Sequence, residues 1–449
     1  MSRGMLVLVA VIGLASATAA DEVAVTVYNS NLGVISEVRT LEFDKGAGRL
    51  AFRDVPSQID ATSVQFELVD PGKAVTILEQ NYAFDLVSPD KIYEKYVDQD
   101  IELVAKEGQL FSGQLLAYSG GAVTLRDKAG KIKILTLANI SETNFPALPE
   151  GLITRPTLFW NYQSDFDGST ACRVGYQTAG MNWAAEYVGL LDSKDTQLGL
   201  SGWSSINNMS GKTYQDAKLK LVAGDIHRAP TPREKGVMME ADRLMTAAAG
   251  FEEKAFFEYH MYTLPRPATL ADNEIKQISL FEPATAKIKK IYLYKPDYNS
   301  RDVAVKVEFA NSREAGLGMP LPAGRVRVFK ADEDGSMILV GEDNIDHTPK
   351  DEKVSLTIGT AFDIAAEEKL VQQSLISKQV EEREYAIELR NRKDEDVTIT
   401  VEKSLWGFWE VMSANLPYEQ KDANTLVFQV PVEANTTATI NLKVRFTNR

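Results

Sequence analysis

The chain has 449 residues, with 63 acidic and 49 basic side chains, and its net charge of −14 argues against several classes of function. A protein that binds the phosphate backbone of nucleic acid needs a basic surface, so no nucleic-acid partner is expected. The same acidity opposes docking on anionic lipid surfaces. The length allows two or three domains and a large hydrophobic core.

The first twenty residues have the pattern of a secretory signal peptide. Arg3 gives a basic start, residues 5–14 form an apolar run, and residues 17–20 are small enough for a cleavage site. The apolar run is too short for a membrane span, which takes about 20 residues, and no later stretch is long and apolar enough. We therefore expect an exported protein, periplasmic or extracellular, without a transmembrane segment. Because no Cys follows the cleavage site, a lipid anchor is not expected.

The single Cys of the chain, Cys172, has no partner for an intramolecular disulfide. An exported chain without disulfides must be held together by its own hydrophobic core. We interpret Cys172 as a small buried hydrophobic residue. A nucleophilic thiol would need a base, and the nearest His in the sequence, His227, is distant.

Residues 21–145 are predicted to form an N-terminal β region. Apolar and polar side chains alternate along 22–28 and 34–43, and turn residues end each run, which is typical of a sandwich or barrel. Within this region, residues 100–141 contain four short strand patterns separated by turns that include Gly. Short strands so closely spaced favour a small SH3-like barrel, to which we assign a structural role rather than peptide binding.

The remainder, 150–449, is predicted to be a C-terminal β-sandwich domain. A Pro-rich linker leads into it, and three strand patterns, each with a Trp, open it. Residues 228–252 break the alternation: Pro, Met and Ala are frequent there, without a helix cap or a clean apolar stripe, so we expect a mobile loop. The fold class expected for the whole chain is all-β, with several antiparallel sandwich or barrel units.

One segment carries conflicting signals. Leu370, Val371, Leu375 and Ile376 recur at nearly helical spacing, which locally predicts an amphipathic helix over 365–382. Strand patterns flank this segment on both sides. The residues alone leave open whether it is helix or strand.

Residues 325–341 are predicted to form a β-hairpin within the C-terminal sandwich. Val326 and Val328 alternate with arginines, and an Asp-Gly pair follows between two apolar runs. The first pattern is typical of a strand with one wet face, and the second is a strong hairpin signal. We expect Val326 and Val328 to face the core and Phe329 to point outward.

Acidic residues gather at the turn of this hairpin and after its second strand. The weak candidates for a metal site are Asp332, Asp334, Asp343 and Asp346. A calcium loop needs a distal bidentate Glu at a fixed offset, which is missing here, and a folded hairpin would split the acidic residues between its two ends. We therefore interpret them as turn and loop residues, and the neighbouring His347 as a side chain bonded to backbone; Ca²⁺ binding at the turn stays open.

The sequence carries no continuous catalytic motif. Its three His form no pair at metal-ligand spacing, and a nucleophile elbow, a dinucleotide fingerprint and a phosphate-binding loop are all missing. We predict no catalytic residue, no cofactor-binding residue and no cofactor. A carboxylate pair assembled from distant residues would leave no such motif. The five Trp lie in predicted strands, where large rings more often fill the core than form a platform for sugars.

Several ordered motifs resemble a known family. Residues 202–224 resemble its signature N-x-x-G-x-x-Y/W-x-D-A-x-L, with Asn208 and Gly211 at the first two fixed positions. The further similar segments are 181–187, 262–267, 318–324, 341–343, 347–349 and 406–409. The family is the domain of unknown function numbered 4139, which includes mucoidy-inhibitor-A-like envelope proteins, and the resemblance covers about 150–449. It implies an exported, β-rich protein without assigned catalytic residues. It also implies an extended strand, not a helix, over 365–382.

Two hypotheses for function follow. The first is an exported, non-enzymatic β-sandwich protein of the bacterial cell envelope that acts by binding or scaffolding, with an envelope protein or glycan as partner. The second is a secreted, carbohydrate-active hydrolase that uses a carboxylate pair, suggested by the surplus of acids beside Trp-bearing strands. The sequence does not define the partner or the oligomeric state.

Overall fold

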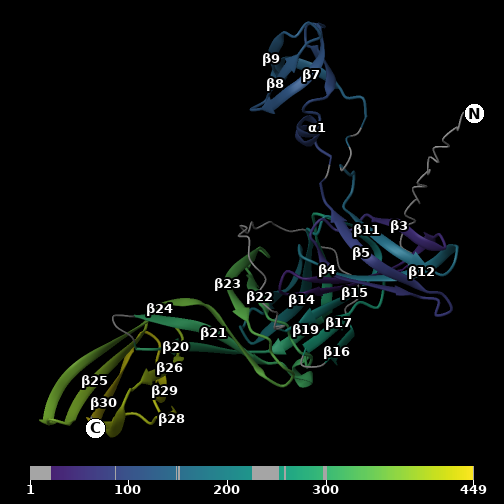
Figure 1. Cartoon of the computed structure of the whole chain (residues 1–449). Coiled ribbons are helices and arrows are strands. Elements are labelled where there is room, and N and C mark those ends of the chain that lie inside the picture. The colour runs from purple at the N-terminus through teal and green to yellow at the C-terminus, as the bar shows by residue number, and fades with distance from the viewer. Residues whose placement is uncertain are drawn as a thin grey trace, which may run out of the picture.

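A computed structural model of the chain describes residues 22–85, 87–147, 149, 152–224, 252–256, 259–296 and 301–447. Nearly all its regular structure is β, arranged as a central body, a small unit that projects from it, and an elongated C-terminal unit (Figure 1). The expected all-β class is confirmed. No helix in the described ranges is long and apolar enough to cross a membrane.

The largest sheet of the central body contains strands from both sides of the predicted domain boundary, before residue 145 and after residue 150. Its order is β16-β17-β15-β1-β2-β12-β4, and β18 also pairs with β15. The bounds are β1 (Glu22–Tyr28), β2 (Gly33–Phe43), β4 (Ile59–Leu68), β12 (Gly168–Thr178), β15 (Tyr214–Ala223), β16 (Glu252–Phe256), β17 (Tyr259–Thr263) and β18 (Ala268–Leu270). β1 and β15 pair in parallel, Ala24 with Lys218 and Tyr28 with Val222.

Two further sheets complete the central body. A three-stranded sheet has the order β3-β11-β5, and a five-stranded sheet has the order β19-β14-β13-β22-β23. The bounds are β3 (Gly46–Arg53), β5 (Val75–Ala83), β11 (Thr157–Ser164), β13 (Met181–Leu191), β14 (Gln197–Asn208), β19 (Glu274–Lys287), β22 (Gly324–Ala331) and β23 (Met337–Ile345); the short 3₁₀ helix η2 (Arg313–Ala315) precedes β22.

One hydrophobic core runs through the central body, from Val25 and Ile35 on the N-terminal strands to Trp183 and Val328 further along the chain. The expected boundary between 145 and 150 therefore does not separate two cores. Strands from both sides of that boundary pair with each other and exclude water together, so the N-terminal β region and the start of the C-terminal region form one body.

The small unit lies where the SH3-like barrel was predicted. Its five strands have the order β10-β6-β7-β8-β9, and it has its own core, which includes Leu103, Leu115 and Val123. It projects from the central body beyond β5 and β11 (Figure 1). The bounds are α1 (Pro89–Lys95), β6 (Asp100–Ala105), β7 (Leu110–Ser119), β8 (Ala122–Arg126), β9 (Ile132–Thr136), η1 (Leu137–Asn139) and β10 (Ile140–Asn144).

The C-terminal unit is a nine-stranded sheet that folds around a third core. Its order is β27-β30-β25-β24-β21-β20-β26-β29-β28. The bounds are β20 (Lys289–Tyr294), β21 (Asp302–Ala310), β24 (Lys353–Ser377), β25 (Val380–Asn391), β26 (Val397–Ser404), β27 (Phe408–Ala414), β28 (Glu419–Asp422), β29 (Thr425–Val432) and β30 (Thr437–Thr447).

Strand β24 belongs to both larger cores. Val354 and Leu356 near its start are buried in the central core, whereas Ile364 and Ala366 are buried in the C-terminal core. Its neighbour β21 makes the same crossing and pairs with it along residues 353–365. A paired β ribbon, not a flexible linker, therefore joins the two units (Figure 1).

The segment 365–382 is strand, not helix. It forms the end of β24, the turn after it and the start of β25, and the two strands pair from Ile364 with Asn391 to Ser377 with Val380. The aliphatic residues that suggested an amphipathic helix are exposed on this hairpin: Leu370 by 49%, Val371 by 65%, Leu375 by 73% and Ile376 by 58%. Tertiary pairing overrides the local periodicity.

The predicted hairpin at 325–341 is present as β22 and β23. Val326 and Val328 are buried in the central core, as expected, and Phe329 is half-buried. The turn closes with a hydrogen bond from the Asp332 N–H to the Ser336 carbonyl. Gly335 has a φ of +83°, which favours Gly there. Of the loop expected at 228–252, all but Glu252 lies outside the described residues.

Candidate functional site

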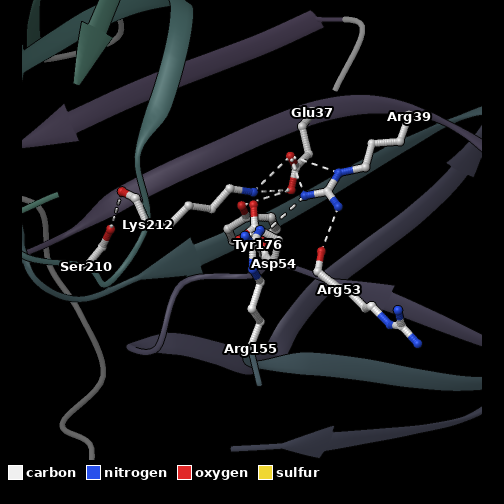
Figure 2. Close-up of polar contacts among 8 residues, drawn as sticks. All are labelled: Glu37, Arg39, Arg53, Asp54, Arg155, Tyr176, Ser210 and Lys212. Atoms are coloured by element: carbon white, nitrogen blue, oxygen red, sulfur yellow. Dashed lines mark hydrogen bonds and ion pairs between the residues drawn. The ribbon is translucent and has the colours of Figure 1, made fainter. Parts of the chain in front are cut away.

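The most concentrated group of charges inside the central body lies between β2, β12 and the connection from β14 to β15 (Figure 2). Glu37 and Arg39 come from β2 and are 0% and 4% exposed. Tyr176 comes from β12 and is also buried. Lys212, 9% exposed, comes from the connection after β14. We call these four residues the buried ionic cluster.

Glu37 is the centre of the buried ionic cluster. Its Oε2 accepts hydrogen bonds from Arg39 Nη2 at 2.9 Å, Arg39 Nε at 3.2 Å and Lys212 Nζ at 3.1 Å. Its Oε1 accepts from the Tyr176 hydroxyl at 3.0 Å and from Lys212 Nζ at 3.2 Å. Both oxygens are thus fully used, which buried charges require.

Arg39 extends the cluster to the edge of the neighbouring sheet. Its Nη1 donates to the Arg53 carbonyl at 2.7 Å and its Nη2 to the Asp54 carbonyl at 3.4 Å. Its guanidinium also lies over the Phe52 ring, 4.1 Å from the ring centre. The Asp54 carboxylate turns outward and forms an ion pair with Arg155 at 3.1 Å (Figure 2). Arg39 therefore ties β2 to the chain that follows β3.

Lys212 lies in the tight connection between β14 of the five-stranded sheet and β15 of the largest sheet of the central body. Asn208 Nδ2 donates to the carbonyls of Lys212, Leu270 and Ala271, at 2.8, 3.1 and 3.1 Å. Its Oδ1 accepts from the Ser210 hydroxyl at 2.7 Å. Gly211 has a φ of +87°, and a Cβ there would collide with Ser57. The Asn and Gly of the signature seen in the sequence thus build the turn that places the Lys212 side chain beside Glu37.

Burial dominates the electrostatics of the buried ionic cluster. It lowers the pKa of Lys212, and the nearby Arg39 adds to this while Glu37 opposes it. Burial also raises the pKa of Tyr176 well above its usual value. One carboxylate faces two cationic side chains, so the cluster as a whole has more positive than negative groups. Its members are hydrogen-bonded to one another and shielded from solvent, which suits them to fixing how the sheets pack rather than to acting on a substrate.

A large part of the chain is similar to a known protein family. A family model described as a domain of unknown function (DUF4139) matches residues 172–447, more than half of the chain. The chain belongs to this family. The family suggested by the sequence motifs is therefore confirmed. A search of the curated proteins gave no match.

The DUF4139 match and the folded body do not have the same limits. The match begins at Cys172, inside β12. The strands β1, β2 and β4 precede it, yet they lie in the same sheet as β12 and β15. Glu37 and Arg39 are in this preceding part, whereas Tyr176 and Lys212 are within the matched residues. The buried ionic cluster thus joins the DUF4139 region to the N-terminal strands.

The weak metal candidates are divided as the hairpin geometry predicted. Asp332 and Asp334 lie at the turn between β22 and β23, next to the pair Ala331–Met337. Asp343 and Asp346 lie near the other end, where Gly324 pairs with Ile345. In the described part of the chain, no group of three or more His, Cys, Asp or Glu could hold a metal ion.

Asp334, Asp343 and the neighbouring His347 each have a local structural role. Asp334 accepts from the Ser336 N–H at 2.8 Å, and hydrogen bonds from the Ser336 side chain and backbone lower the pKa of Asp334. Asp343 accepts from the Thr357 N–H at 2.6 Å and so links β23 to β24. Nδ1 of His347 accepts from the Ala323 N–H at 3.1 Å, the backbone contact expected for it.

The tryptophans divide into core and surface residues. Trp160 and Trp183 are 1% exposed and Trp203 is 8% exposed. Trp409 is half-buried on β27. Trp406, in the loop before β27, is 76% exposed. The indole N–H of Trp183 donates to the Val222 carbonyl at 3.0 Å, which stabilises a large ring in the core.

The Cys172 thiol is expected to be inert in the folded protein. The residue is 0% exposed, and burial raises the pKa of its thiol to about 12. The thiolate is the reactive form, so labelling with a fluorescent maleimide at neutral pH should be slow in buffer and complete in denaturant. The extent of labelling is measured by mass spectrometry of the intact protein. Rapid labelling under native conditions would show that β12 opens locally.

Proposed function

We propose that this DUF4139 protein is exported and acts in the bacterial cell envelope by binding or scaffolding, not by catalysis. The observation that supports this most is where the polar and apolar side chains lie. The charged groups of the buried ionic cluster are buried and paired with one another. Large apolar side chains are exposed on the outlying units as well as on parts of the central body, where a partner can reach them.

Two exposed apolar sites support the binding proposal. On β9 of the projecting unit, Ile132 and Ile134 are 63% and 74% exposed and lie on the same side of the strand. At the end of the C-terminal unit, Trp406 is 76% exposed. Exposed apolar side chains that cluster on one element are typical of interaction surfaces. Export is supported by the signal-peptide pattern of the first twenty residues.

The hydrolase alternative needs a carboxylic acid that stays protonated near neutral pH, about 5–9.5 Å from a second carboxylate. Glu381 and Glu382 on the C-terminal sheet have lowered pKa values instead. Hydrogen bonds from Arg445 and Lys443 lower the pKa of Glu382, and a hydrogen bond from Arg383 lowers that of Glu381. Carboxylates held in the ionised form by cations are poor general acids. We therefore favour binding over hydrolysis.

The experiment isolates the full-length protein from envelope fractions together with whatever is cross-linked to it. The variants are Ile134→Glu and Trp406→Glu, and Leu78→Glu, on β5 of the central body, is the matched control because Leu78 is 62% exposed. We expect one protein or glycan partner that is recovered with the native protein and the control and lost with one of the two variants. Fractionation of the cells should place the protein in the envelope.

Two results would contradict the proposal. The first is recovery of no protein or glycan partner from the envelope fraction. The second is hydrolysis of an envelope polysaccharide by the purified protein, with loss of activity when a single carboxylate is replaced by its amide.

A further inference from the structure

The second half of β24 has one unpaired edge. Along residues 353–365 the strand pairs with β21 on one side, and along 364–377 it pairs with β25 on the other. No strand in the described ranges pairs with the β21 side of residues 369–377. Alternate backbone N–H and carbonyl groups of an edge point away from the sheet and can accept another strand.

The side chains of this edge are suited to pairing with another strand. Residues 369–377 contain neither Pro nor Gly and no acidic residue. Leu370, Val371, Leu375 and Ile376 are each about half exposed or more. Proteins normally protect a free edge with Pro, Lys, inward charges, bulges or a covering element. This edge has one Lys and two bulges, yet four exposed aliphatic side chains lie along it and no described residue covers it.

The exposed aliphatic residues are placed symmetrically about Gln373. Leu370 and Ile376 lie three positions to either side of it, and Val371 and Leu375 lie two positions to either side. In an antiparallel pair of identical strands centred on Gln373, Leu370 therefore faces Ile376 and Val371 faces Leu375. A twofold contact requires this kind of self-complementary surface.

The two bulges of β24 are also placed symmetrically about Gln373. The pairing of β24 with β25 skips Val371, between Leu370 and Gln372, and skips Ile376, between Leu375 and Ser377. In the pairing centred on Gln373, the bulge at 370–371 lies opposite the bulge at 375–376 of the second strand. Each strand can then follow the bend of the other.

The charges at the ends of the segment are compatible with the same pairing. It places Lys369 opposite Ser377 rather than opposite a second lysine, and it places Lys378 opposite Glu368, which is already paired with Lys403 at 2.6 Å on its own sheet. Lys369 is already paired on its own sheet, with Glu388 at 3.2 Å and Glu367 at 3.8 Å. Unlike charges across an antiparallel pair attract, and like charges repel.

We propose that residues 369–377 of β24 form the dimer interface of this protein, with the same edge of a second copy added in antiparallel orientation about Gln373. The nine-stranded sheets of the two copies then form one continuous sheet. The interface is isologous, so each copy supplies the same residues, and it closes after two copies.

The first test measures the mass of the full-length protein by light scattering across a dilution series. We expect a dimer that dissociates on dilution. We expect Val371→Lys to weaken dimerisation about tenfold or more, because both copies carry the substitution and two positive charges therefore enter the interface. Phe362→Lys is the matched control: Phe362 lies on the same strand, is 99% exposed and is outside the free edge. A monomer at every concentration, or a dimer that Val371→Lys leaves unchanged, would overturn the proposal.

The second test determines which residues face each other across the proposed dimer interface. With Cys172→Ser as background, Gln373→Cys should form a disulfide between copies under mild oxidation, because facing residues of an antiparallel pair have Cα atoms about 4.5–5.5 Å apart. Ser374→Cys is the control, since it faces Gln372 rather than itself. Cross-linking at 374 but not at 373 would contradict the pairing. If Gln373→Cys in cells cross-links to a different protein and the isolated chain stays monomeric, the edge serves another chain and the dimer proposal is wrong.

Discussion

Replacing Glu37 by glutamine is expected to destabilise the protein more than any other single change in the buried ionic cluster. The amide removes the one carboxylate that Arg39 and Lys212 share and leaves two cationic side chains buried without a counter-charge. Breaking a buried ion pair in this way costs about 3–5 kcal/mol. The net stability of a folded protein is typically about 5–15 kcal/mol. Unfolding in urea, followed by circular dichroism, measures the loss.

Lys212→Met is the matched variant for the Glu37 experiment. It removes the second cation and leaves Glu37 paired with Arg39 at 2.9 Å, so the remaining charges balance. A methionine of similar length can fill the space, and replacing part of a buried ionic group by an apolar side chain is often close to neutral. We therefore expect Lys212→Met to cost much less than Glu37→Gln. Equal losses for the two variants would show that Lys212 is as important to the cluster as the carboxylate.

The dependence of stability on pH gives a separate test of the role of Lys212. Burial lowers the pKa of Lys212 below its usual 10.5, so the folded protein releases this proton at a lower pH than the unfolded chain does. Between the folded and unfolded pKa values the unfolded chain binds more protons, and stability therefore rises with pH in that window. Lys212→Met should remove this contribution. The difference in unfolding free energy between native protein and variant, measured over an alkaline pH series, tests it; parallel curves would contradict it.

Val328→Asp is expected to have the second largest effect. Val328 is 1% exposed in the central core, between its neighbours Gly189 on β13 and Gly341 on β23. Burying a Val side chain contributes about 1.5–3 kcal/mol, and the variant also places an unpaired carboxylate in the core. Together these effects could remove much of the net stability. The melting temperature and the urea midpoint should both fall sharply.

Asp334→Ala is the control for the Val328 experiment. It changes an exposed turn residue of the same hairpin, whose side chain accepts a hydrogen bond from Ser336. Its cost should be far smaller. If Asp334→Ala lowered the melting temperature as much as Val328→Asp, and only with calcium present, the acidic turn would be a metal site.

Much of the fold could be predicted because alternation and turn residues are local signals. The hairpin of β22 and β23, the burial of Val326 and Val328, and the small unit near 100–141 all depend on patterns within a few residues. Local patterns also misled: the spacing from Leu370 to Ile376 favours a helix, and pairing with β25 makes it a strand. The parallel pairing of β1 with β15 could not be predicted, because no local pattern records a contact between such distant segments.

The buried ionic cluster could not be predicted in full from the sequence, because it too depends on contacts between distant segments. Apolar residues occur on both sides of β2, so its alternation does not show which side faces the core. One signal was available: Glu37 and Arg39 are in phase with Leu41 and Phe43, the larger apolar residues. Two charges in that phase indicate a buried pair that needs further partners. Tyr176 and Lys212 could be found only from the structure, since they come from distant segments.

The pairing of β1 with β15 has a consequence for how the chain reaches its folded state. The neighbours of β1 in the sheet are β2, which follows directly, and β15, which begins at Tyr214. Sheet contacts between such distant segments form slowly, because closing a long loop costs entropy before any contact compensates for it. During synthesis, the β15 side of β1 stays unpaired until residues 218–222 have emerged. A chain with this order of strands has a long interval in which an open edge can aggregate, so its folding should depend on a chaperone.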